Sequence, residues 1–327
     1  MRDALLELLA DFEIRPVLVD IGASGSPPEI WRTISRRSIY VGFDPDLREM
    51  REIPEGEYHR SFILNAAVTA QGGGEARFFL TKSPYCSSTL PPDHESLSDF
   101  LYSDLFQVER AQQVPAVTLD EALARLSLDR VDWLKLDTQG TDLRIFKSMA
   151  GDSRRRVLAL DIEPGLIDAY RGEDLFVESH RELTREGFWL SDLAVKGTVR
   201  MRRSTLSEIG ALPAAPDESL VRRTVRTTPG WCEARYLRRP DGEHGPRDVR
   251  DFVLLWGFSL LDGQYGYALD LAVEYRKRFG ADAVFTRLLD VPLRRIREAG
   301  RRSRYREALR LPARVLRRIR RTWRERR

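Results

Sequence analysis

Near the start of the chain an apolar strand runs into a turn with two glycines, Val19-Asp20-Ile21-Gly22-Ala23-Ser24-Gly25. The pattern predicts a strand over Arg15–Ile21 and a helix from Pro27 through Ile34, since proline is tolerated in a first helical turn. In doubly wound α/β folds such a unit lies at the carboxyl edge of the sheet, where ligands bind. Glycines lack Cβ atoms and let a ligand approach the backbone. Taken alone, the unit suits several classes of nucleotide-binding protein as well as a plain turn.

Further strands and helices alternate along the chain after this unit. Apolar segments predict strands at Ser38–Phe43, Arg60–Val68, Ala76–Leu80, Ala116–Leu119, Val131–Asp137, Arg156–Ile162 and Gly187–Leu193. Helical patterns occupy Asp120–Leu126, the stretch through Leu143 and Met149, and Leu175–Glu186. Such alternation predicts an α/β fold with a Rossmann-like, doubly wound, mostly parallel sheet. No period persists over Thr81–Gln113, which we expect to be a long excursion with one short helix around Ser96–Phe106, in the place of a lid.

The chain divides into four parts on this pattern. We expect an N-terminal helix over 1–14, the α/β domain over 15–200, a linker and small α-helical extension over 201–286, and an Arg-rich basic tail over 287–327. The linker is the polar, Pro-containing stretch Ser204–Asp217. The extension has the pattern of a helical hairpin, Val249–Leu261 followed by Gln264–Phe279.

Composition narrows the class of protein. The 327 residues are 42% hydrophobic, enough for one α/β core and a smaller appendage. The N-terminal helix pattern lacks the basic region and cleavage site of a signal peptide. The longest apolar run, Phe252–Leu261, falls well short of the roughly 20 residues that a membrane span needs. Cys86 and Cys232 are too few for a disulfide framework or a four-thiolate zinc site. These features predict a cytoplasmic protein.

A carboxylate follows the second predicted strand. Asp44 lies 24 residues after Asp20, where an acidic side chain can accept both ribose hydroxyls of an adenosine-containing cofactor. A solvated turn aspartate is the alternative. A dinucleotide such as NAD needs a Gly-x-Gly-x-x-Gly turn to hold its pyrophosphate, and the turn here lacks the third glycine. The spacing therefore favours a nucleoside cofactor other than NAD.

Ordered motifs over Val17–Ser191 carry a resemblance to a known family. They are Val19-Asp20-Ile21-Gly22-Ala23, Gly42-Phe43-Asp44-Pro45, Asn65-Ala66-Ala67-Val68, Ser87-Ser88-Thr89-Leu90, Val117-Thr118-Leu119-Asp120 and Leu134-Lys135-Leu136-Asp137-Thr138-Gln139-Gly140-Thr141-Asp142. In these the chain resembles the FkbM-type methyltransferases. The resemblance implies a class I methyltransferase fold, S-adenosylmethionine as cofactor, and O-methylation of a hydroxyl on a sugar or glycan.

The resemblance also implies a set of cofactor-binding residues. They are Asp20, Gly22, Ala23, Ser24, Gly25, Asp44, Pro45, Asn65, Ala66 and Asp137, with Asn65 and Ala66 near the adenine. The pair Ser87-Ser88 is implied to lie near the cofactor or the acceptor.

The chain departs from the family's usual pattern at four positions. Ser24 and Ser26 stand where the family usually has Asn and Gly, and Gln139 and Asp142 stand where it usually has Glu. A glutamine at position 139 removes a negative charge beside the methyl-transfer face. A non-catalytic or scaffold protein that retains the fold is therefore the alternative function.

Three residues are candidates for catalysis. A hydroxyl acceptor needs a carboxylate or histidine to take its proton. Asp137, at the end of a predicted strand, is the first candidate, with a helix-cap role as the alternative. Glu163 follows the next strand, and His94 lies in the excursion that could close over a substrate. No His, Cys, Asp or Glu group has convincing metal-ligand spacing, although a divalent ion at Asp137 and its neighbours stays open.

Charge is segregated along the chain. The segment Arg287–Arg327 contains 17 arginines and four acidic residues, a net charge of +13, so the rest of the chain carries −9. Within Arg310–Arg327 the apolar residues Leu311, Val315, Leu316, Ile319 and Trp323 share one helical face. Such a helix suits an anionic membrane surface and implies a peripheral location at the inner face of the plasma membrane. A solvated tail and a helix packed on the acidic body are the alternatives; the lack of interleaved stacking aromatics disfavours nucleic acid.

Overall fold

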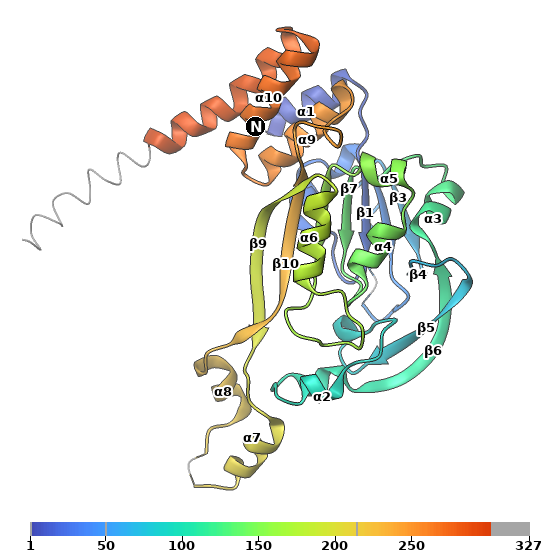
Figure 1. The fold of residues 1–327 in the computed structure, drawn as a ribbon, viewed down its shortest axis with the longest axis vertical. Coiled ribbons are helices and arrows are strands. Elements are labelled where there is room, and N and C mark those ends of the chain that lie inside the picture. Colours follow the sequence, from blue (N-terminus) through green and yellow to red (C-terminus); the bar gives the residue numbers. More distant parts are fainter. Residues whose placement is uncertain (1, 50, 214, 302–327) are drawn as a thin grey trace, which may run out of the picture.

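A seven-stranded sheet forms the centre of the molecule in the computed structural model, which describes residues 2–49, 51–213 and 215–301 (Figure 1). The strands lie in the order β3-β2-β1-β7-β8-β10-β9. Their bounds are β1 Val17–Ile21, β2 Ile39–Phe43, β3 Arg60–Leu64, β7 Trp133–Leu136, β8 Ala159–Ile162, β9 Phe188–Thr198 and β10 Thr228–Arg238. β10 runs antiparallel to both of its neighbours, and the other pairs are parallel. This confirms the predicted mostly parallel α/β sheet.

The central strands are buried on both faces. Successive side chains of a strand point to opposite faces, so β1 sends Leu18 into one core and Val19 into the other. β7 does the same with Trp133 and Leu134. Burial on both faces explains why these segments are continuous apolar runs in the sequence.

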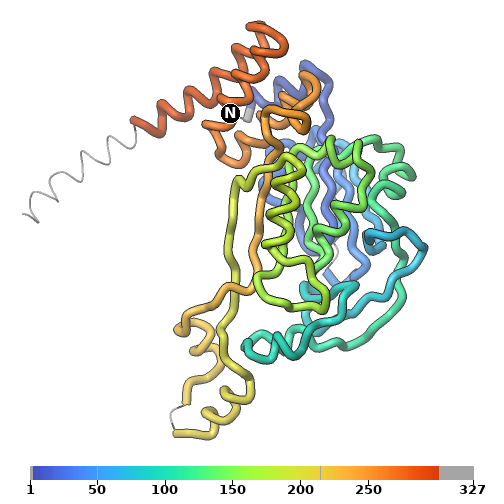
Figure 2. Tube along the Cα trace, in the orientation of Figure 1, coloured from blue at the N-terminus to red at the C-terminus, as the bar shows by residue number. Residues whose placement is uncertain are grey.

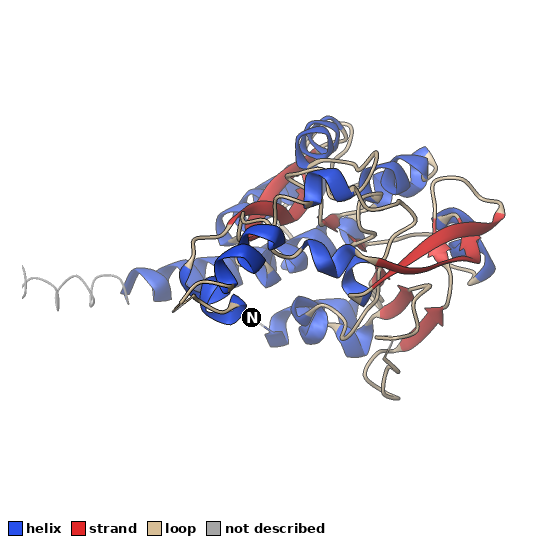
Figure 3. Ribbon diagram, turned by 90° about the horizontal axis from the view of Figure 1, so that it is seen from below, coloured by secondary structure: helices blue, strands red, loops and turns tan. Residues whose placement is uncertain are grey.

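Helices cover both faces of the sheet, as Figure 3 shows by colour. One core receives apolar side chains from α3 Leu119–Arg125, α4 Asp142–Ser148 and α6 Phe176–Arg185, while α5 Gly151–Arg156 lies at the surface. The other core contains α1 Arg2–Asp11, α9 Val249–Leu261 and α10 Tyr265–Phe279. The blue N-terminal segment and the orange C-terminal helices therefore lie side by side (Figure 2). The predicted helical hairpin is confirmed.

An ion pair fastens this helical cap to the amino ends of the strands. Arg250 of α9 donates two hydrogen bonds of 2.7 Å to the Asp132 carboxylate, which is fully buried. The same carboxylate accepts the backbone N–H of Val17 at 2.8 Å. Arg250 therefore anchors α9 at the amino ends of β1 and β7.

A second, three-stranded sheet stands beside the first. Its order is β4-β6-β5, with β4 Ala67–Val68, β5 Gly74–Thr81 and β6 Val108–Val117. The predicted strand Ala76–Leu80 is thus formed, but outside the central sheet. The expected excursion Thr81–Gln113 is corrected in part: it holds η3 Pro84–Cys86, α2 His94–Leu97 and η4 Ser103–Phe106, and β6 begins within it. The first residues of β6 are exposed, so they carry no apolar alternation.

Residues 201–286 differ most from their prediction as a linker and helical extension. They contain the short helices α7 Arg203–Gly210 and α8 Glu218–Thr224, which project beyond the body of the molecule (Figure 1), and then β10. β10 lies between β8 and β9, so the sheet continues past residue 200. Charged residues such as Glu233 and Arg235 alternate with the buried Cys232, Ala234 and Tyr236. The segment therefore has no continuous apolar run, and the sequence did not indicate a strand there.

The structure also differs from the sequence prediction after the glycine turn and at the start of the basic tail. The predicted helix from Pro27 to Ile34 is instead the 3-10 helix η1 Glu29–Thr33, which is followed by a second, η2 Ser35–Arg37, with Trp31 and Ile34 buried. The predicted tail starts inside the fold: residues 283–301 are helical, and Leu288 and Val291 are buried in the core with α9. The predicted amphipathic helix over 310–327 lies outside the described residues. Within the described part of the chain, no helix has the length and apolarity needed to cross a membrane.

Candidate functional site

The carboxyl ends of β1, β2, β7 and β8 surround a cavity of about 430 Å³. It lies where the strand order reverses between β1 and β7, the position at which open α/β sheets bind ligands. Its volume falls within the range of about 300–1,000 Å³ found for small-molecule sites. Its walls include Gly22 and Ser24 after β1, Asp44 after β2, and Asp137 after β7.

The glycine turn brings β1 and β7 together. Gly22 has a φ of +84°, and a Cβ atom added to it would lie 2.0 Å from the backbone oxygen of Asp137. Any other residue would push the two strand ends apart. The N–H groups of Gly22 and Ala23 both donate to the Phe43 carbonyl at 2.9 Å, which joins this turn to β2.

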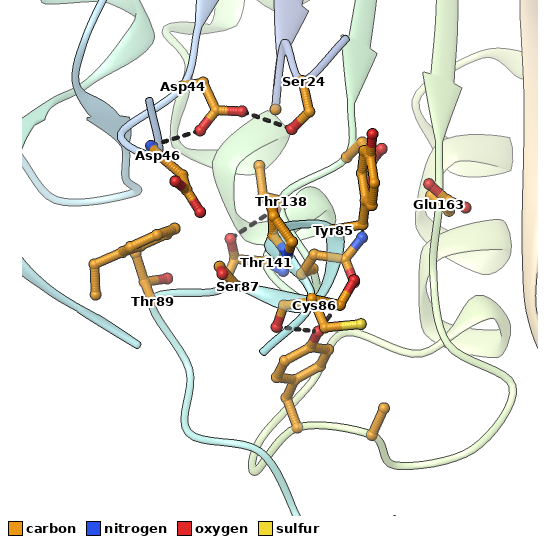
Figure 4. Close-up of a pocket in the computed structure, with 18 of the residues that line it drawn as sticks. Ser24, Asp44, Asp46, Tyr85, Cys86, Ser87, Thr89, Thr138, Thr141 and Glu163 are labelled. Atoms are coloured by element: carbon orange, nitrogen blue, oxygen red, sulfur yellow. Dashed lines mark hydrogen bonds between the residues drawn. The ribbon is translucent and has the colours of Figure 1, made fainter. Parts of the chain in front are cut away.

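Asp44 is buried at one end of the cavity. Its Oδ2 accepts a hydrogen bond from Ser24 Oγ at 2.8 Å, and its Oδ1 accepts the N–H of Asp46 at 2.7 Å (Figure 4). Asn65 Nδ2 donates to the Asp44 carbonyl at 2.9 Å. Burial raises the pKa of the Asp44 carboxyl above its ordinary value. Ser24, a departure from the family pattern, therefore orients the Asp44 carboxylate.

Asp20 has a different role from the one expected. Its side chain accepts hydrogen bonds from Lys135 Nζ at 2.9 Å and from the Tyr40 hydroxyl at 3.2 Å, and it is not among the residues that line the cavity. Lys135 Nζ also lies 3.6 Å from Asp137 Oδ2. Asp20 thus holds the lysine that neutralises charge beside Asp137.

Two carboxyl groups, Asp137 after β7 and Glu163 after β8, line the cavity together. Burial, the negative charge of Asp137 and a hydrogen bond with Asp137 raise the pKa of Glu163 to about 9. Gln139 Nε2 donates to Asp137 Oδ1 at 2.7 Å. Glu163 and Asp44 stand on opposite sides of the cavity (Figure 4).

Asp142 fixes the loops that carry this pair. Its Oδ1 accepts the N–H of Thr138 at 2.9 Å and the Thr138 hydroxyl at 2.6 Å, and its Oδ2 accepts the N–H of Glu163 at 2.9 Å. Burial raises its pKa to about 6. The aspartate at this position therefore ties the ends of β7 and β8 together, although the family usually has Glu here.

An aromatic wall closes the end of the cavity near Glu163. Tyr102 and Trp231 stack with their ring centroids 6.1 Å apart and their planes 10° apart, and Phe106 and Tyr170 line the same region. Trp231 belongs to β10, which was not predicted as a strand. Nothing in the sequence brings these aromatics together, since they come from three distant segments.

The lining of the cavity is acidic, and two of its carboxyl groups are paired with cations behind the lining: Asp46 with Arg48 at 2.6 Å and Asp137 with Lys135 at 3.6 Å. Five carboxyl groups line the cavity, from Asp44, Asp46, Asp137, Glu163 and Glu173. Of the side chains that the structure describes, no Lys, Arg or His is part of the lining. Within the same residues no cluster of three or more His, Cys, Asp or Glu is arranged to hold a metal ion.

The predicted site residues fall into three groups. Those that line the cavity are Gly22, Ser24, Asp44, Pro45, Ala66, Asp137 and Glu163. Those that lie behind the lining are Asp20, Ala23, Gly25 and Asn65, and of the predicted pair Ser87-Ser88 only Ser87 lines the cavity. His94 is exposed on α2 and is not part of the lining, so the structure does not place it with the other catalytic candidates.

The strand order and the position of the cavity define an α/β fold of the class I methyltransferase type. The sequence model of the family described as the methyltransferase FkbM domain matches residues 23–190, just over half of the chain. The chain belongs to this family, which confirms the resemblance seen in its motifs, and it carries a methyltransferase domain. No curated protein matches the chain.

Proposed function

We propose that the protein transfers a methyl group from S-adenosylmethionine to a hydroxyl of a sugar or glycan. The observation that carries the proposal is the cavity at the strand-order switch, which has five carboxyl groups and, among the described residues, no basic side chain in its lining. The family supplies the reaction type, and the chemistry of the lining supports the donor and the acceptor class.

The lining fits S-adenosylmethionine. This donor carries a sulfonium and an ammonium group, and both are cations that carboxylates attract. Asp44 would hold the ribose hydroxyls, apolar Phe43, Ala66 and Val68 offer surface for the adenine, and Asp137 and Glu163 would face the cationic part. NAD suits the lining poorly, because its pyrophosphate needs cations or a free helix N-terminus.

The protein's own task in the reaction is alignment and removal of a proton. When bound, S-adenosylmethionine supplies an activated methyl group, so holding the acceptor in line with it provides most of the rate enhancement. Asp137, which Lys135 and Gln139 hold in place, would accept the proton of the acceptor hydroxyl. The buried Glu163 would orient the same hydroxyl.

The acceptor end of the cavity favours an uncharged sugar. The apolar face of a sugar ring can pack on an aromatic side chain such as Trp231, while carboxylates accept hydrogen bonds from its hydroxyls. A uronic acid or a sugar phosphate would bring negative charge against Asp137, with no cation in the described lining to compensate it. We therefore propose that the methylated unit is neutral.

The scaffold alternative rests on Gln139 and Asp142. Both side chains make hydrogen bonds that hold the Asp137 and Glu163 loops, as expected of a maintained site. This supports the enzyme over the scaffold.

Two measurements test the proposed function. Calorimetry with S-adenosylmethionine, S-adenosylhomocysteine and NAD should show binding of the first two only, and absence of binding by both would contradict the proposal. Transfer of labelled methyl should then appear in a neutral glycan fraction and not in an acidic one, and be lost in Asp137→Asn. Donor binding without transfer to any fraction would favour the scaffold.

We also propose that the basic C-terminal segment binds an anionic membrane surface at the inner face of the plasma membrane. Residues 302–327 contain 12 arginines and two glutamates. Since Leu288 and Val291 belong to the core, a variant ending at Arg301 keeps the packed part of the last helix. Full-length protein should sediment with anionic but not neutral liposomes and the shortened variant with neither; equal sedimentation of both proteins would overturn the proposal.

A further inference from the structure

Two adjacent serines, Ser87 and Ser88, follow η3 and contact two different strand-end loops. The backbone of Ser87 is extended, with a φ of −77° and a ψ of 138°, so neighbouring side chains point to opposite sides. Ser87 Oγ accepts a hydrogen bond from Arg48 Nη2 at 3.0 Å, while Ser88 Oγ donates to the Gln139 carbonyl at 2.7 Å. One hydroxyl therefore reaches the loop after β2, and the other reaches the turn after β7.

The Ser87 hydroxyl is fully used within the protein, although Ser87 lines the cavity (Figure 4). Its oxygen accepts the N–H of Thr81 at 3.1 Å as well as the Arg48 bond, which fills both lone pairs. Its proton can go to Thr81 Oγ1, 3.4 Å away, because the Thr81 hydroxyl donates to the Ser83 carbonyl at 2.7 Å. Ser88 is buried behind the lining. The pair is thus built to hold the protein's own loops rather than a ligand.

Arg48 connects Ser87 with the carboxylate that is proposed to hold the ribose. Its Nε and Nη2 donate to Asp46 Oδ2 at 3.0 and 2.6 Å, and its Nη1 donates to the Thr81 carbonyl at 2.9 Å. The N–H of Asp46 in turn donates to Asp44 Oδ1 at 2.7 Å. A planar guanidinium with several donors can make all these bonds at once. They fix the Asp44 loop against the end of β5.

Ser88 fixes the turn that carries Asp137. Gln139, whose carbonyl accepts the Ser88 hydroxyl, has a φ of +57°, in the left-handed region that few residues other than glycine adopt. The Nε2 of the same residue donates to Asp137 Oδ1 at 2.7 Å. The bond from Ser88 therefore holds the turn in the conformation in which the Gln139 amide reaches Asp137.

We propose that Arg48, Ser87 and Ser88 are positioning residues, a clasp that sets the Asp44 loop at a fixed distance from the Asp137 turn. β1 lies between β2 and β7 in the sheet, so these two loops come from strands that do not pair, and the clasp joins them from the side of β5. The proposal rests on the proposed methyl transfer, in which donor and acceptor must stay in line. A misplacement of about 1 Å can cost about a hundredfold in rate.

Substitution at each end of the clasp gives different expected results. Ser88→Ala should lower kcat for transfer to the neutral glycan fraction by about tenfold, the loss of one buried hydrogen bond, with the affinity for S-adenosylhomocysteine unchanged. Arg48→Ala should lower kcat by a similar factor and also weaken S-adenosylhomocysteine binding, because it releases Asp46 beside Asp44. The matched control Ser191→Ala removes a hydroxyl-to-carbonyl bond between β9 and β10, outside the cavity lining, and should change neither quantity.

The double variant Arg48→Ala/Ser88→Ala distinguishes a clasp from two separate local supports. Among the described residues the two side chains share no hydrogen-bond partner, so independent losses should multiply to about a hundredfold. A clasp that is already open at one end has little more to lose, so we expect kcat within about threefold of either single variant. A hundredfold loss would overturn the proposal.

Arg48→Lys separates the geometry of the clasp from its charge. Lysine keeps a cation beside Asp46 but lacks the planar fork that also reaches Ser87 and the Thr81 carbonyl. We therefore expect kcat to stay at the level of Arg48→Ala. Recovery of the wild-type kcat by lysine would show that charge alone is needed and would contradict the clasp.

Amide hydrogen exchange of residues 138–142 in the full-length protein tests the clasp without donor or acceptor. Within the described residues Arg48 has no hydrogen bond to this turn, yet Arg48→Ala should speed its exchange several-fold, as Ser88→Ala should. Unchanged exchange of the turn in folded Arg48→Ala would refute the proposal. If Ser88→Ala does not fold, Arg48→Ala and Arg48→Lys decide, since the Arg48 side chain is 36% exposed. Faster exchange in a protein that binds no donor would support the clasp and contradict only the proposed methyl transfer.

Discussion

The two ends of the cavity are built in different ways. The end around Asp44 comes from two consecutive strand-turn units, with Gly22 and Ser24 after β1 and Asp44 after β2. The end around Glu163 combines Tyr102, directly before η4, and Trp231 from β10, residues that lie far apart in the chain. The first end is set by local turn geometry and the second by the order of strands in the sheet. We expect the end set by local turns to bind the methyl donor and the end set by the strand order to bind the acceptor.

If the two ends are independent, single substitutions should weaken donor binding and acceptor binding separately. The largest effect is expected at Asp44. Asp44→Ala should weaken S-adenosylmethionine binding by about a hundredfold, because a charge-assisted hydrogen bond contributes about 1.5–3 kcal/mol and the ribose has two hydroxyls. Calorimetry measures this loss. Asp192→Ala, at an exposed position of β9, is the control and should bind normally. Donor affinity within threefold of wild type would remove Asp44 from the donor site.

Trp231→Ala should act on the acceptor end alone. We expect the KM for the neutral acceptor to rise by about tenfold, since an aromatic contact contributes about 0.5–1.5 kcal/mol beyond the area it buries. Donor affinity should stay unchanged, and Trp231→Phe should restore most of the loss. Steady-state methyl transfer with each substrate varied in turn measures the separation. Equal losses of donor and acceptor affinity would show that the two ends are not independent.

The smallest expected effect is a dependence of donor affinity on pH. The pKa of Glu163 is raised to about 9 by burial and by Asp137, so this group is protonated at neutral pH and ionises as pH rises. A cationic donor prefers the ionised form, so donor binding should release protons and its affinity should increase a few-fold between neutral pH and about pH 9. Calorimetry in buffers of different ionisation enthalpy measures both quantities. Glu163→Gln should remove the dependence, and affinity that falls with pH in the wild type would contradict it.

The residues of the cavity end around Asp44 could be found from the sequence. Gly22 has a positive φ and no room for a Cβ atom, and Asp44 follows an apolar strand at a fixed distance, so both leave a local pattern. His94 is exposed on α2 outside the lining, and the irregular sequence around it gave no information on where it packs. Trp231 was missed because β10 alternates charged and buried residues, and the long stretch before it resembled a linker.

The sequence by itself determined the strand-turn-helix units, the helical hairpin and the family, because each depends on residues close together in the chain. Only the tertiary structure decided which carboxyl groups meet. Asp137 and Glu163 share one cavity because β7 and β8 are parallel neighbours, and Asp142 joins the loops that follow them. Gln139 likewise meets Tyr170, 31 residues further along the chain, only in the folded protein. Hydrogen bonds and charges act over distances of a few ångströms in space, whatever the separation in sequence.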